Sequence, residues 1–298
     1  MINYLHHIEI DKKKWDDCIE NAAQQLPYAL SWYLDIACES WDALVLNDYE
    51  AVMPLPFKKK LGLHFIYQPF FTQQLGIFGN CIAGEFTQKI PAHFRHIHTN
   101  LNFLNELLSS VNWKINSEKN LVLKSTERIS EANFSEHCRR NIKKSQRFGL
   151  RIATCKAKDL TDIFQTVKGK NISHLKPKNY KTLLHLISEM QKRGMADITG
   201  VYSNENELLG GAVFIRYKNR RIFYFSALSE KGKEKCSMYF LISEKILNEN
   251  DADIIWDFEG SNDEGLARFY KGFGAKEENY YSLIRNTLPF PLHLLKNK

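Results

Sequence analysis

Two carboxylates lie close together near the C-terminal end of the chain, in a stretch of otherwise apolar residues. Asp257 and Glu259 are two positions apart and alternate with Trp256 and Phe258. Because side chains alternate along a strand, both carboxylates are expected on one face of it. A carboxylate with a raised pKa can take a proton from an attacking amine, directly or through water. Asp257 and Glu259 are therefore candidate general bases. Alternatively, one of them caps the next helix or pairs with Arg268.

A run of basic residues without any acidic one extends from Arg139 to Lys158. Its first part has helical spacing, with Phe134, Cys138 and Ile142 on the inward side, so the basic side chains are expected to face water. Such a run can neutralise phosphates and bind RNA or another polyanion in a salt-dependent way. A solvated helix face is the alternative. The candidate polyanion-binding residues are Arg139, Arg140, Lys143, Lys144 and Arg147.

Composition narrows the classes of protein to consider. The chain has 298 residues, 44% of them hydrophobic, which is enough for two ordinary domains, or one large one, with a proper core. Its six cysteines are scattered without a CxxC pair, so we expect reduced thiols, no metal and a cytoplasmic protein. A net charge of +7 favours an anionic partner, such as a nucleotide phosphate, RNA or an anionic lipid surface; the alternative is that no charged partner exists, since a mild excess of lysine is common on protein surfaces.

Membrane insertion is not expected from the sequence. No apolar run approaches the roughly 20 residues that span a bilayer, so we expect no integral membrane association. The tail Leu288–Lys298 is apolar and then basic, but it is too short to span and is expected to dock on the fold.

The second half of the chain has a clear order of predicted elements. After a first helix comes the series β-α-α-β-β-β-α-β-α-β, in which short polar turns make the three consecutive strands antiparallel neighbours. The later strand–helix units make the sheet mixed, so the fold class is α/β with an α+β type of mixed sheet. Gly210 and Gly211 lie inside a strand and indicate a bulge or a close backbone approach. The elements are a helix at Glu131–Phe148, a strand at Arg151–Cys155, helices around Leu160–Val167 and Tyr180–Met190, strands at Asp197–Ser203, Glu207–Tyr217 and Arg221–Leu228, a helix at Ser237–Asn248, a strand at Asp253–Phe258, a helix at Glu264–Phe273 and a strand at Tyr280–Arg285.

The first half is less regular. Apolar spacing predicts helices and strands there as well. They are helices at Asp11–Leu26, Ser31–Glu39 and Gln88–Phe94, and strands at Ala43–Leu46, Glu50–Phe57, His64–Phe71 and Gln73–Phe78.

The element order and several motifs resemble the GNAT acyltransferase superfamily, and within it the FemAB-like branch, in which two GNAT-like domains lie in tandem. The resemblance is strongest over residues 130–285 and implies two GNAT-like domains, 1–120 and 121–298. The motifs that carry it are Asp257-Phe-Glu-Gly-Ser261 with the helix Gly265–Ala275, the helix His137–Ser145, and in the first half Pro54-Leu-Pro56, Tyr67-Gln-Pro69 and Gln73–Phe78.

The resemblance implies where an activated donor, such as acyl-CoA, would bind. In such proteins the amide-bearing arm of the donor pairs with exposed backbone where two parallel strands separate. Donor phosphates lie at the N-terminus of the next helix, where free N–H groups favour negative charge. The implied cofactor-binding residues are Ser226, Ala227, Leu228, Lys231, Gly232, Lys233, Lys235 and Ser237.

Two positions of the implied phosphate loop depart from the pattern Arg/Gln-x-x-Gly-x-Gly/Ala. Aligned from Lys233, the two small positions are Cys236 and Met238, whose side chains would crowd a coenzyme A pyrophosphate. The loop then binds coenzyme A differently, the donor is another molecule, or donor binding is lost.

The resemblance also implies a general acid and an acceptor site. Tyr270 matches a tyrosine that often protonates the leaving thiolate in GNAT enzymes, although packing within an aromatic cluster is an alternative. An amine acceptor, a small molecule or a peptide, would enter between the domains near Gln73, Gln74 and Glu259. The leading hypothesis is an N-acyltransferase. The alternatives are an aminoacyl-tRNA-dependent peptidyltransferase, with tRNA as a partner, and a non-catalytic binding protein on a GNAT fold.

Overall fold

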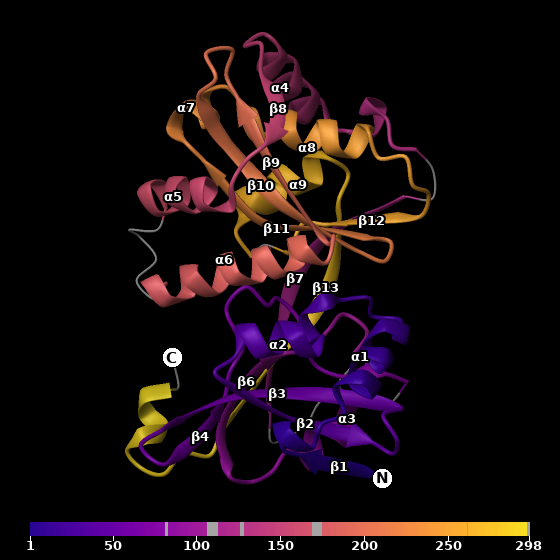
Figure 1. Ribbon diagram of the computed structural model, residues 1–298, viewed down its shortest axis with the longest axis vertical. Helices are drawn as coiled ribbons and strands as arrows, with labels where there is room; N and C mark the ends of the chain where they lie inside the picture. Colours follow the sequence, from indigo (N-terminus) through magenta and orange to yellow (C-terminus); the bar gives the residue numbers. More distant parts are fainter. Residues whose placement is uncertain (81–82, 106–112, 126–127, 169–174, 261, 297–298) are drawn as a thin grey trace. The chain divides into compact units, whose positions relative to one another are not determined.

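The computed structural model describes residues 1–80, 83–105, 113–125, 128–168, 175–260 and 262–296 (Figure 1). The chain divides into two compact units, and each is described by itself. Unit 1 contains Met1–Glu118 and Asn279–Lys298, and unit 2 contains Lys119–Glu278. The sequence analysis assigned the segment after Glu278 to the second domain, whereas it belongs to unit 1.

Unit 1 is built on a sheet in the order β1-β2-β3-β4-β6-β13, with β5 beside β3. All its neighbours are antiparallel except β4 and β6, which are parallel. Leu44, Met53, Phe86, Phe94 and Leu283 belong to its apolar core. The strands are β1 (Ile2–Leu5), β2 (Ser40–Leu46), β3 (Ala51–Lys60), β4 (Leu63–Ile66), β5 (Phe78–Gly79), β6 (Phe94–Asn100) and β13 (Lys276–Asn286), and the helices are α1 (Lys12–Asn21), α2 (Ser31–Ala37) and α3 (Ala83–Lys89).

Two predicted elements of the first half are wrong. Of the segment Gln73–Phe78, only Phe78 lies in a strand, β5; buried amide side chains form hydrogen bonds with the backbone of the residues before it. Asn102 Nδ2, for example, donates to the carbonyl oxygens of Leu75 and Ile77 at 3.0 and 2.7 Å. The helix predicted at Gln88–Phe94 ends at Lys89, two residues before a proline, and Phe94 begins β6.

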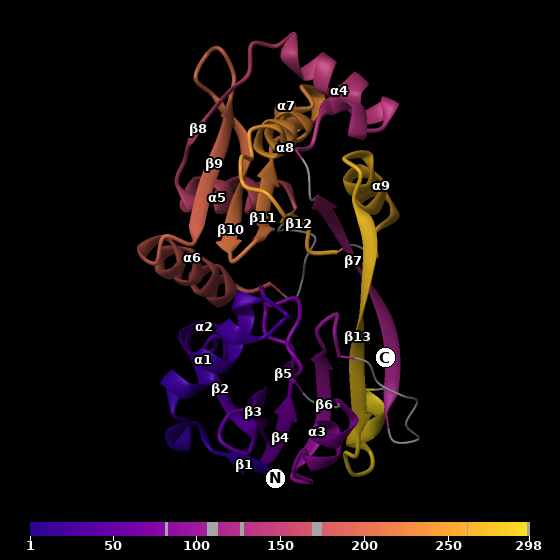
Figure 2. The same ribbon diagram turned by 90° about the vertical axis from the view of Figure 1, so that its right-hand side faces the viewer.

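Unit 2 is built on a sheet in the order β7-β12-β11-β10-β9-β8 (Figure 2). The pairs are antiparallel except β11 and β12, which are parallel. The predicted order of elements is confirmed, with β7 and the short helix α7 in addition, and its last strand is β13, described above with unit 1. The strands are β7 (Lys114–Ser125), β8 (Arg151–Thr154), β9 (Ala196–Tyr202), β10 (Leu208–Tyr217), β11 (Arg220–Leu228) and β12 (Ile254–Asp257), and the helices are α4 (Glu136–Gln146), α5 (Ala157–Val167), α6 (Pro177–Lys192), α7 (Glu230–Glu234), α8 (Ser237–Leu247) and α9 (Glu264–Gly272).

Helices cover both faces of the sheet in unit 2. Ile142 of α4, Leu241 of α8 and Phe273 after α9 belong to one buried cluster with the sheet. On the other face, the ring of Phe164 in α5 lies 5.2 Å from that of Phe225 in β11. The sheet core is therefore shielded on both sides.

The glycine pair in β10 marks a real irregularity. Its pairing with β9 shifts register between Leu208 and Gly210, so the predicted bulge is confirmed. A Cβ atom added at Gly210 would lie 2.5 Å from the carbonyl oxygen of Ala227 in β11, which leaves room only for glycine.

The described residues can also be examined for membrane-spanning helices and for disulfide bonds. None of their helices is both long and apolar enough to cross a bilayer. Five cysteines are described and all are free thiols, whereas Cys81 lies outside the described residues.

Candidate functional site

Two parallel strands of unit 2 separate soon after they begin to pair. β11 and β12 pair over three residues each, beginning with Arg220 opposite Ile255 and ending with Ile222 opposite Asp257. β12 ends at Asp257, whereas β11 continues to Leu228. Within the described ranges, no other strand pairs with this edge of β11. The edge is therefore a place where an extended ligand can add β-type hydrogen bonds.

A bulge redirects the side chains of β11 at the point of separation. Val213 pairs with Phe225, and the next residue of β10, Phe214, pairs with Phe223, so Tyr224 is an extra residue. In a regular strand Phe223 and Phe225 would share a face. Here Phe223 belongs to the cluster under α8 while Phe225 contacts Phe164 of α5. The bulge thus separates the two rings at the open edge.

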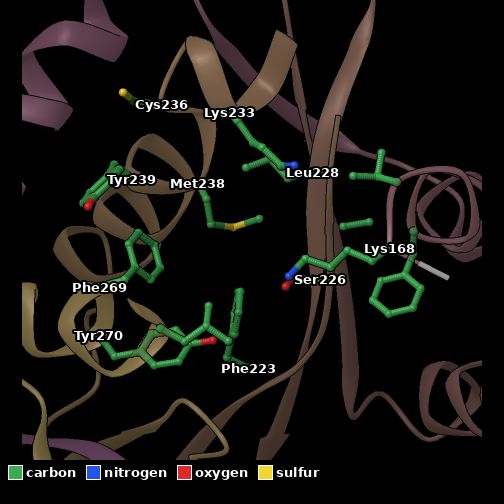
Figure 3. A pocket seen from close by; sticks show the side chains of 14 residues that line it. Lys168, Phe223, Ser226, Leu228, Lys233, Cys236, Met238, Tyr239, Phe269 and Tyr270 are labelled. Atoms are coloured by element: carbon green, nitrogen blue, oxygen red, sulfur yellow. The ribbon is translucent and has the colours of Figure 1, made fainter. Parts of the chain in front are cut away.

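A cavity of about 280 Å³ lies beside this edge, within unit 2. Three of the residues implied to bind a donor, Ser226, Ala227 and Leu228, line it. Figure 3 shows Tyr239, Phe269 and Tyr270 across the cavity from Ser226. Most of the other lining side chains are apolar, and the cationic ones among the described residues are Lys168 and Lys233. Such a cavity suits an apolar ligand body with an anionic end.

Tyr270 lies on α9 at the wall of this cavity. Its side chain is almost fully buried, and its ring stacks on Phe258 with the centroids 4.8 Å apart. Burial raises the pKa of the Tyr270 hydroxyl well above its usual range, and the nearby charge of Glu259 raises it further. The phenol therefore keeps its proton at neutral pH and can donate it to a ligand in the cavity.

Asp257, the first of the two candidate bases, lies at the end of β12. Its carboxylate is fully buried and forms an ion pair with Arg220, which is equally buried. The guanidinium also reaches Glu278 at 3.4 Å. Burial alone would lower the pKa of Arg220, but the two carboxylates together raise it. Asp257 is thus held by Arg220 rather than by Arg268, at the point where β11 and β12 part, and does not line the cavity.

Glu259 does not share a strand face with Asp257. β12 ends at Asp257, and Glu259 has a left-handed backbone with φ of 53°. Its N–H donates to the Asp257 carboxylate at 2.9 Å. The side chain is half-buried and close enough to Tyr270 for its charge to affect the pKa of the phenol. Of the two carboxylates, Glu259 is therefore the less buried.

The segment expected to be a flexible phosphate loop is the short helix α7. The hydroxyl of Ser229 caps it by accepting from the N–H of Gly232 at 3.1 Å. Lys231 pairs with Glu207 at 2.8 Å and Lys233 with Glu230 at 2.6 Å. Lys235 lies over the ring of Phe148, 5.6 Å from its centroid. Of these three lysines, Lys233 alone also lines the cavity.

Gly232 is needed for packing rather than for flexibility. It is buried, and an added Cβ would lie 2.3 Å from the carbonyl oxygen of Leu209. Gly232→Ala is therefore expected to lower the unfolding free energy of unit 2 by about 1–3 kcal/mol. Chemical denaturation measures this. Gly84→Ala is the control, since a Cβ there meets nothing within 4 Å, and an equal loss in both variants would contradict the packing role.

The N-terminus of α8 is crowded, as the sequence indicated. Cys236 precedes the helix with a left-handed backbone of φ 55°, a conformation that favours glycine. Its sulfur lies 3.3 Å from Asn141 Oδ1, and Met238 lines the cavity. Ser237, implied to bind the donor, is fully buried. A pyrophosphate at this helix end would have to displace side chains.

The basic helix α4 presents its charges to solvent. Phe134, Cys138 and Ile142 are buried, which confirms the inward face. Arg140, Lys143, Lys144 and Arg147 are exposed, and Arg139 is half-buried. Arg140 also lies 3.9 Å from Glu136. Binding of a polyanion by these side chains stays a prediction.

The two glutamines predicted to bind the acceptor are engaged within unit 1. Gln74 is fully buried, and its Oε1 accepts the N–H of Phe103 at 2.9 Å. Its amide nitrogen donates to Gln73 Oε1 at 2.9 Å, and the Gln73 carbonyl accepts from Asn100. Gln74 therefore holds a loop in place and is not accessible to an acceptor.

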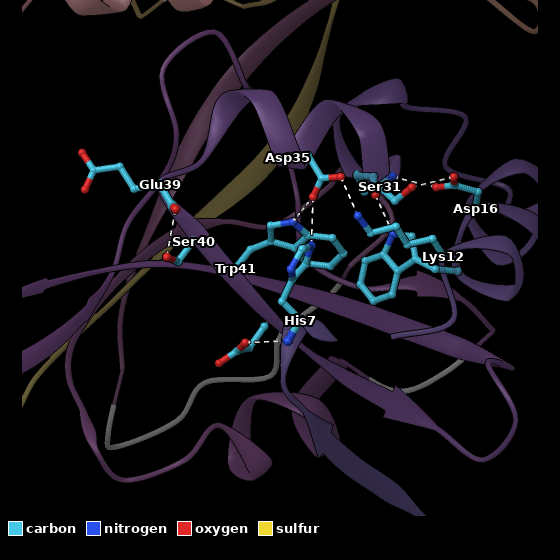
Figure 4. Close-up of polar contacts among 11 residues, drawn as sticks. His7, Lys12, Asp16, Ser31, Asp35, Glu39, Ser40 and Trp41 are labelled. Atoms are coloured by element: carbon cyan, nitrogen blue, oxygen red, sulfur yellow. Dashed lines mark hydrogen bonds and ion pairs between the residues drawn. The ribbon is translucent and has the colours of Figure 1, made fainter. Parts of the chain in front are cut away.

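A polar cluster in unit 1 is a second place where titratable groups gather (Figure 4). Asp35 accepts from His7, Lys12 and Trp41 at 2.9, 2.7 and 3.0 Å. The backbone N–H of His7 donates to Asp42. No group of three or more potential ligands for a metal ion occurs in the described part of the chain. Each of these polar groups is thus already engaged, and the cluster ties the N-terminal segment to β2.

The sequence interpretation missed Arg220 and Lys168. Arg220 begins a strand, where a charged residue is normally exposed, so no sequence signal indicates its burial. Lys168 follows α5, and its place at the cavity depends on how α5 packs on β11.

Comparison with known proteins supports the fold. No family model matches the chain, and no curated protein sequence matches it. Among solved structures, FemX superposes with a TM-score of 0.65 and 12% identity, over 99% of this chain and 100% of FemX. A conserved protein of unknown function from Bacteroides thetaiotaomicron gives 0.60 at 8% identity, over 96% of this chain and 100% of that one. The C-terminal domain of a proposed lysylphosphatidylglycerol synthetase from Agrobacterium fabrum superposes with a TM-score of 0.56 and 11% identity, over 96% of this chain and 94% of that one.

At these identities the likeness concerns the fold. The chain has a GNAT and FemAB-like fold with two GNAT-like units in tandem, as the sequence motifs implied.

Proposed function

We propose that the protein is an acyltransferase that moves an acyl or aminoacyl group from an activated donor to an amine. The observation that carries the proposal is the open edge of β11 beside the cavity, where Ser226–Leu228 can pair with an extended donor arm. The likeness to FemX supports transfer chemistry as the context for this cavity. An amine of a small molecule or a peptide is the proposed acceptor.

Tyr270 and Glu259 are the proposed acid and base. Tyr270 lines the cavity with a protonated hydroxyl and can protonate the leaving group of the donor. Glu259 is half-buried and lies near enough to Tyr270 for its charge to raise the pKa of the phenol, whereas Asp257 is held in a fully buried ion pair with Arg220. It is the proposed base for the attacking amine.

Two donors remain candidates, and a specific observation favours each. The apolar cavity with Lys168 and Lys233 suits the arm of acyl-CoA. The exposed basic face of α4, together with the crowded N-terminus of α8, suits an aminoacyl-tRNA.

Thermal unfolding with each candidate donor separates these possibilities. Acyl-CoA at about 100 times its dissociation constant is expected to add about 2.7 kcal/mol to the unfolding free energy and to raise the Tm. Met238→Trp, which fills the cavity, should abolish the shift, and Lys13→Ala on unit 1 should preserve it. Retention of tRNA at low salt without any shift by acyl-CoA would replace coenzyme A with tRNA as the donor. Failure of both ligands would contradict the transferase proposal and favour a non-catalytic binding protein.

A further inference from the structure

Two segments far apart in the sequence meet at one edge of unit 1. The tip of the hairpin between β3 and β4 contributes Lys60 and Leu61, and the C-terminal segment contributes Leu288 and Leu292, to an apolar groove of about 200 Å³. Figure 1 shows the C-terminal segment, in yellow, beside β4. The sequence interpretation expected this tail to dock on the fold, and Leu288 is indeed buried there.

Around this groove, large apolar side chains point to solvent. Leu61 is 83% exposed, Phe290 79% and Leu294 56%. Single exposed apolar residues are common, but a group of three large ones gathered from two segments is not. The backbone of Leu61 is also left-handed, with φ of 51°, at a turn position where asparagine or glycine is usual. Leucine at this tip is thus favoured neither by the turn nor by burial.

The same edge is positively charged without any acidic residue in its two segments. From Ala51 to Gly84 the sequence contains Lys58, Lys59 and Lys60 and no Asp or Glu. From Asn279 to Lys298 it contains Arg285, Lys296 and Lys298 and again no Asp or Glu. Lys59 and Lys60 are exposed and flank the apolar tip. Apolar side chains surrounded by lysines match the boundary between acyl chains and anionic headgroups.

We propose that the edge formed by Lys59–Leu61 and Leu288–Leu294 docks on the surface of an anionic phospholipid bilayer. Leu61, Phe290 and Leu294 enter the outer part of the acyl region, while Lys59 and Lys60 contact the headgroups. A second copy of the chain fits the charge less well, because two such edges would bring lysines against lysines. This inference concerns unit 1 and does not depend on the donor or the acceptor of the proposed reaction.

Co-sedimentation of the full chain with vesicles tests the proposal. Vesicles of phosphatidylcholine mixed with phosphatidylglycerol are expected to retain the protein, and vesicles of phosphatidylcholine alone to retain much less. Added salt should weaken the binding. Lys59→Ala with Lys60→Ala should weaken it about 25-fold, at about fivefold for each lysine. Leu61→Ser and Phe290→Ser should each weaken it about tenfold.

Matched variants elsewhere in unit 1 serve as controls. Ile8 is 92% exposed and Lys13 is exposed, and neither lies at the proposed edge, so Ile8→Ser and Lys13→Ala should bind as the unchanged protein does. Equal binding to neutral and anionic vesicles, an absence of binding, or equal losses in the control variants would overturn the proposal. A dimer in sedimentation velocity that Leu61→Ser dissociates, without vesicle binding, would assign the edge to a second copy.

Discussion

Asp257→Ala is expected to lower the unfolding free energy of unit 2 by about 3 kcal/mol, the lower end of the range for breaking a buried ion pair. The loss is large because Arg220 is buried and would keep its charge after its partner is removed. The remaining carboxylate of Glu278, at 3.4 Å, limits the cost. Urea denaturation followed by tryptophan fluorescence measures the change, since Trp256 precedes Asp257 in β12.

Two further variants show whether burial causes this effect. Asp251→Ala also removes a carboxylate from an arginine, Arg221, but Asp251 is exposed and Arg221 keeps Glu249, so a loss below about 1 kcal/mol is expected. Replacement of the whole pair, Arg220→Met with Asp257→Leu, should recover most of the stability, because both fully buried charges are removed and Glu278 keeps its ion pair with Lys124 at 2.7 Å. If Asp257→Asn removed turnover while the unfolding free energy stayed unchanged, Asp257 would be a catalytic base after all.

The sequence predicted unit 2 closely for a physical reason. Its helices are amphipathic and end at glycines such as Gly149 and Gly194, both with positive φ, and its central strands are apolar runs between short polar turns. In unit 1, by contrast, β1 has four residues, and the segment Gln73–Phe78 is held by side-chain amides. Neither segment has a regular spacing of apolar residues. The local sequence pattern therefore could not show that one is a strand and that the other is mainly irregular.

The candidate site was predicted less well than the fold, because a site depends on contacts between distant residues. The position of Ser226–Leu228 at the cavity could be predicted, because it depends on the order of the strands and this order can be read from the sequence. The pairing of Asp257 with Arg220 does not, since the two are 37 positions apart and either could have faced solvent. Gly232 is a second example of a contact between distant residues. Glycine is required at this position because a side chain would collide with the backbone of Leu209 on β10.

Tyr270→Phe is expected to reduce kcat roughly 10²- to 10⁴-fold, the usual contribution of a general acid. The variant keeps the ring that stacks on Phe258, so the Tm should change little. Release of free thiol from acyl-CoA, or of deacylated tRNA from aminoacyl-tRNA, measures turnover in the presence of an amine. Tyr239→Phe is the matched control, because Tyr239 lines the same cavity from α8, and its variant should retain turnover near that of the unchanged protein.

The pH dependence gives a second readout of Tyr270 that does not require turnover. An unfolded tyrosine ionises near pH 10, whereas burial raises the pKa of Tyr270 in the folded chain. Above about pH 10 the folded state then binds more protons than the unfolded state, so this group's contribution to stability is full below pH 10 and falls as the pH rises further. Tyr270→Phe should therefore lose less stability than the unchanged protein between about pH 10 and 11. Equal losses would mean that the phenol is not buried as a neutral donor, and a kcat of Tyr270→Phe close to that of Tyr239→Phe would remove it from the chemistry.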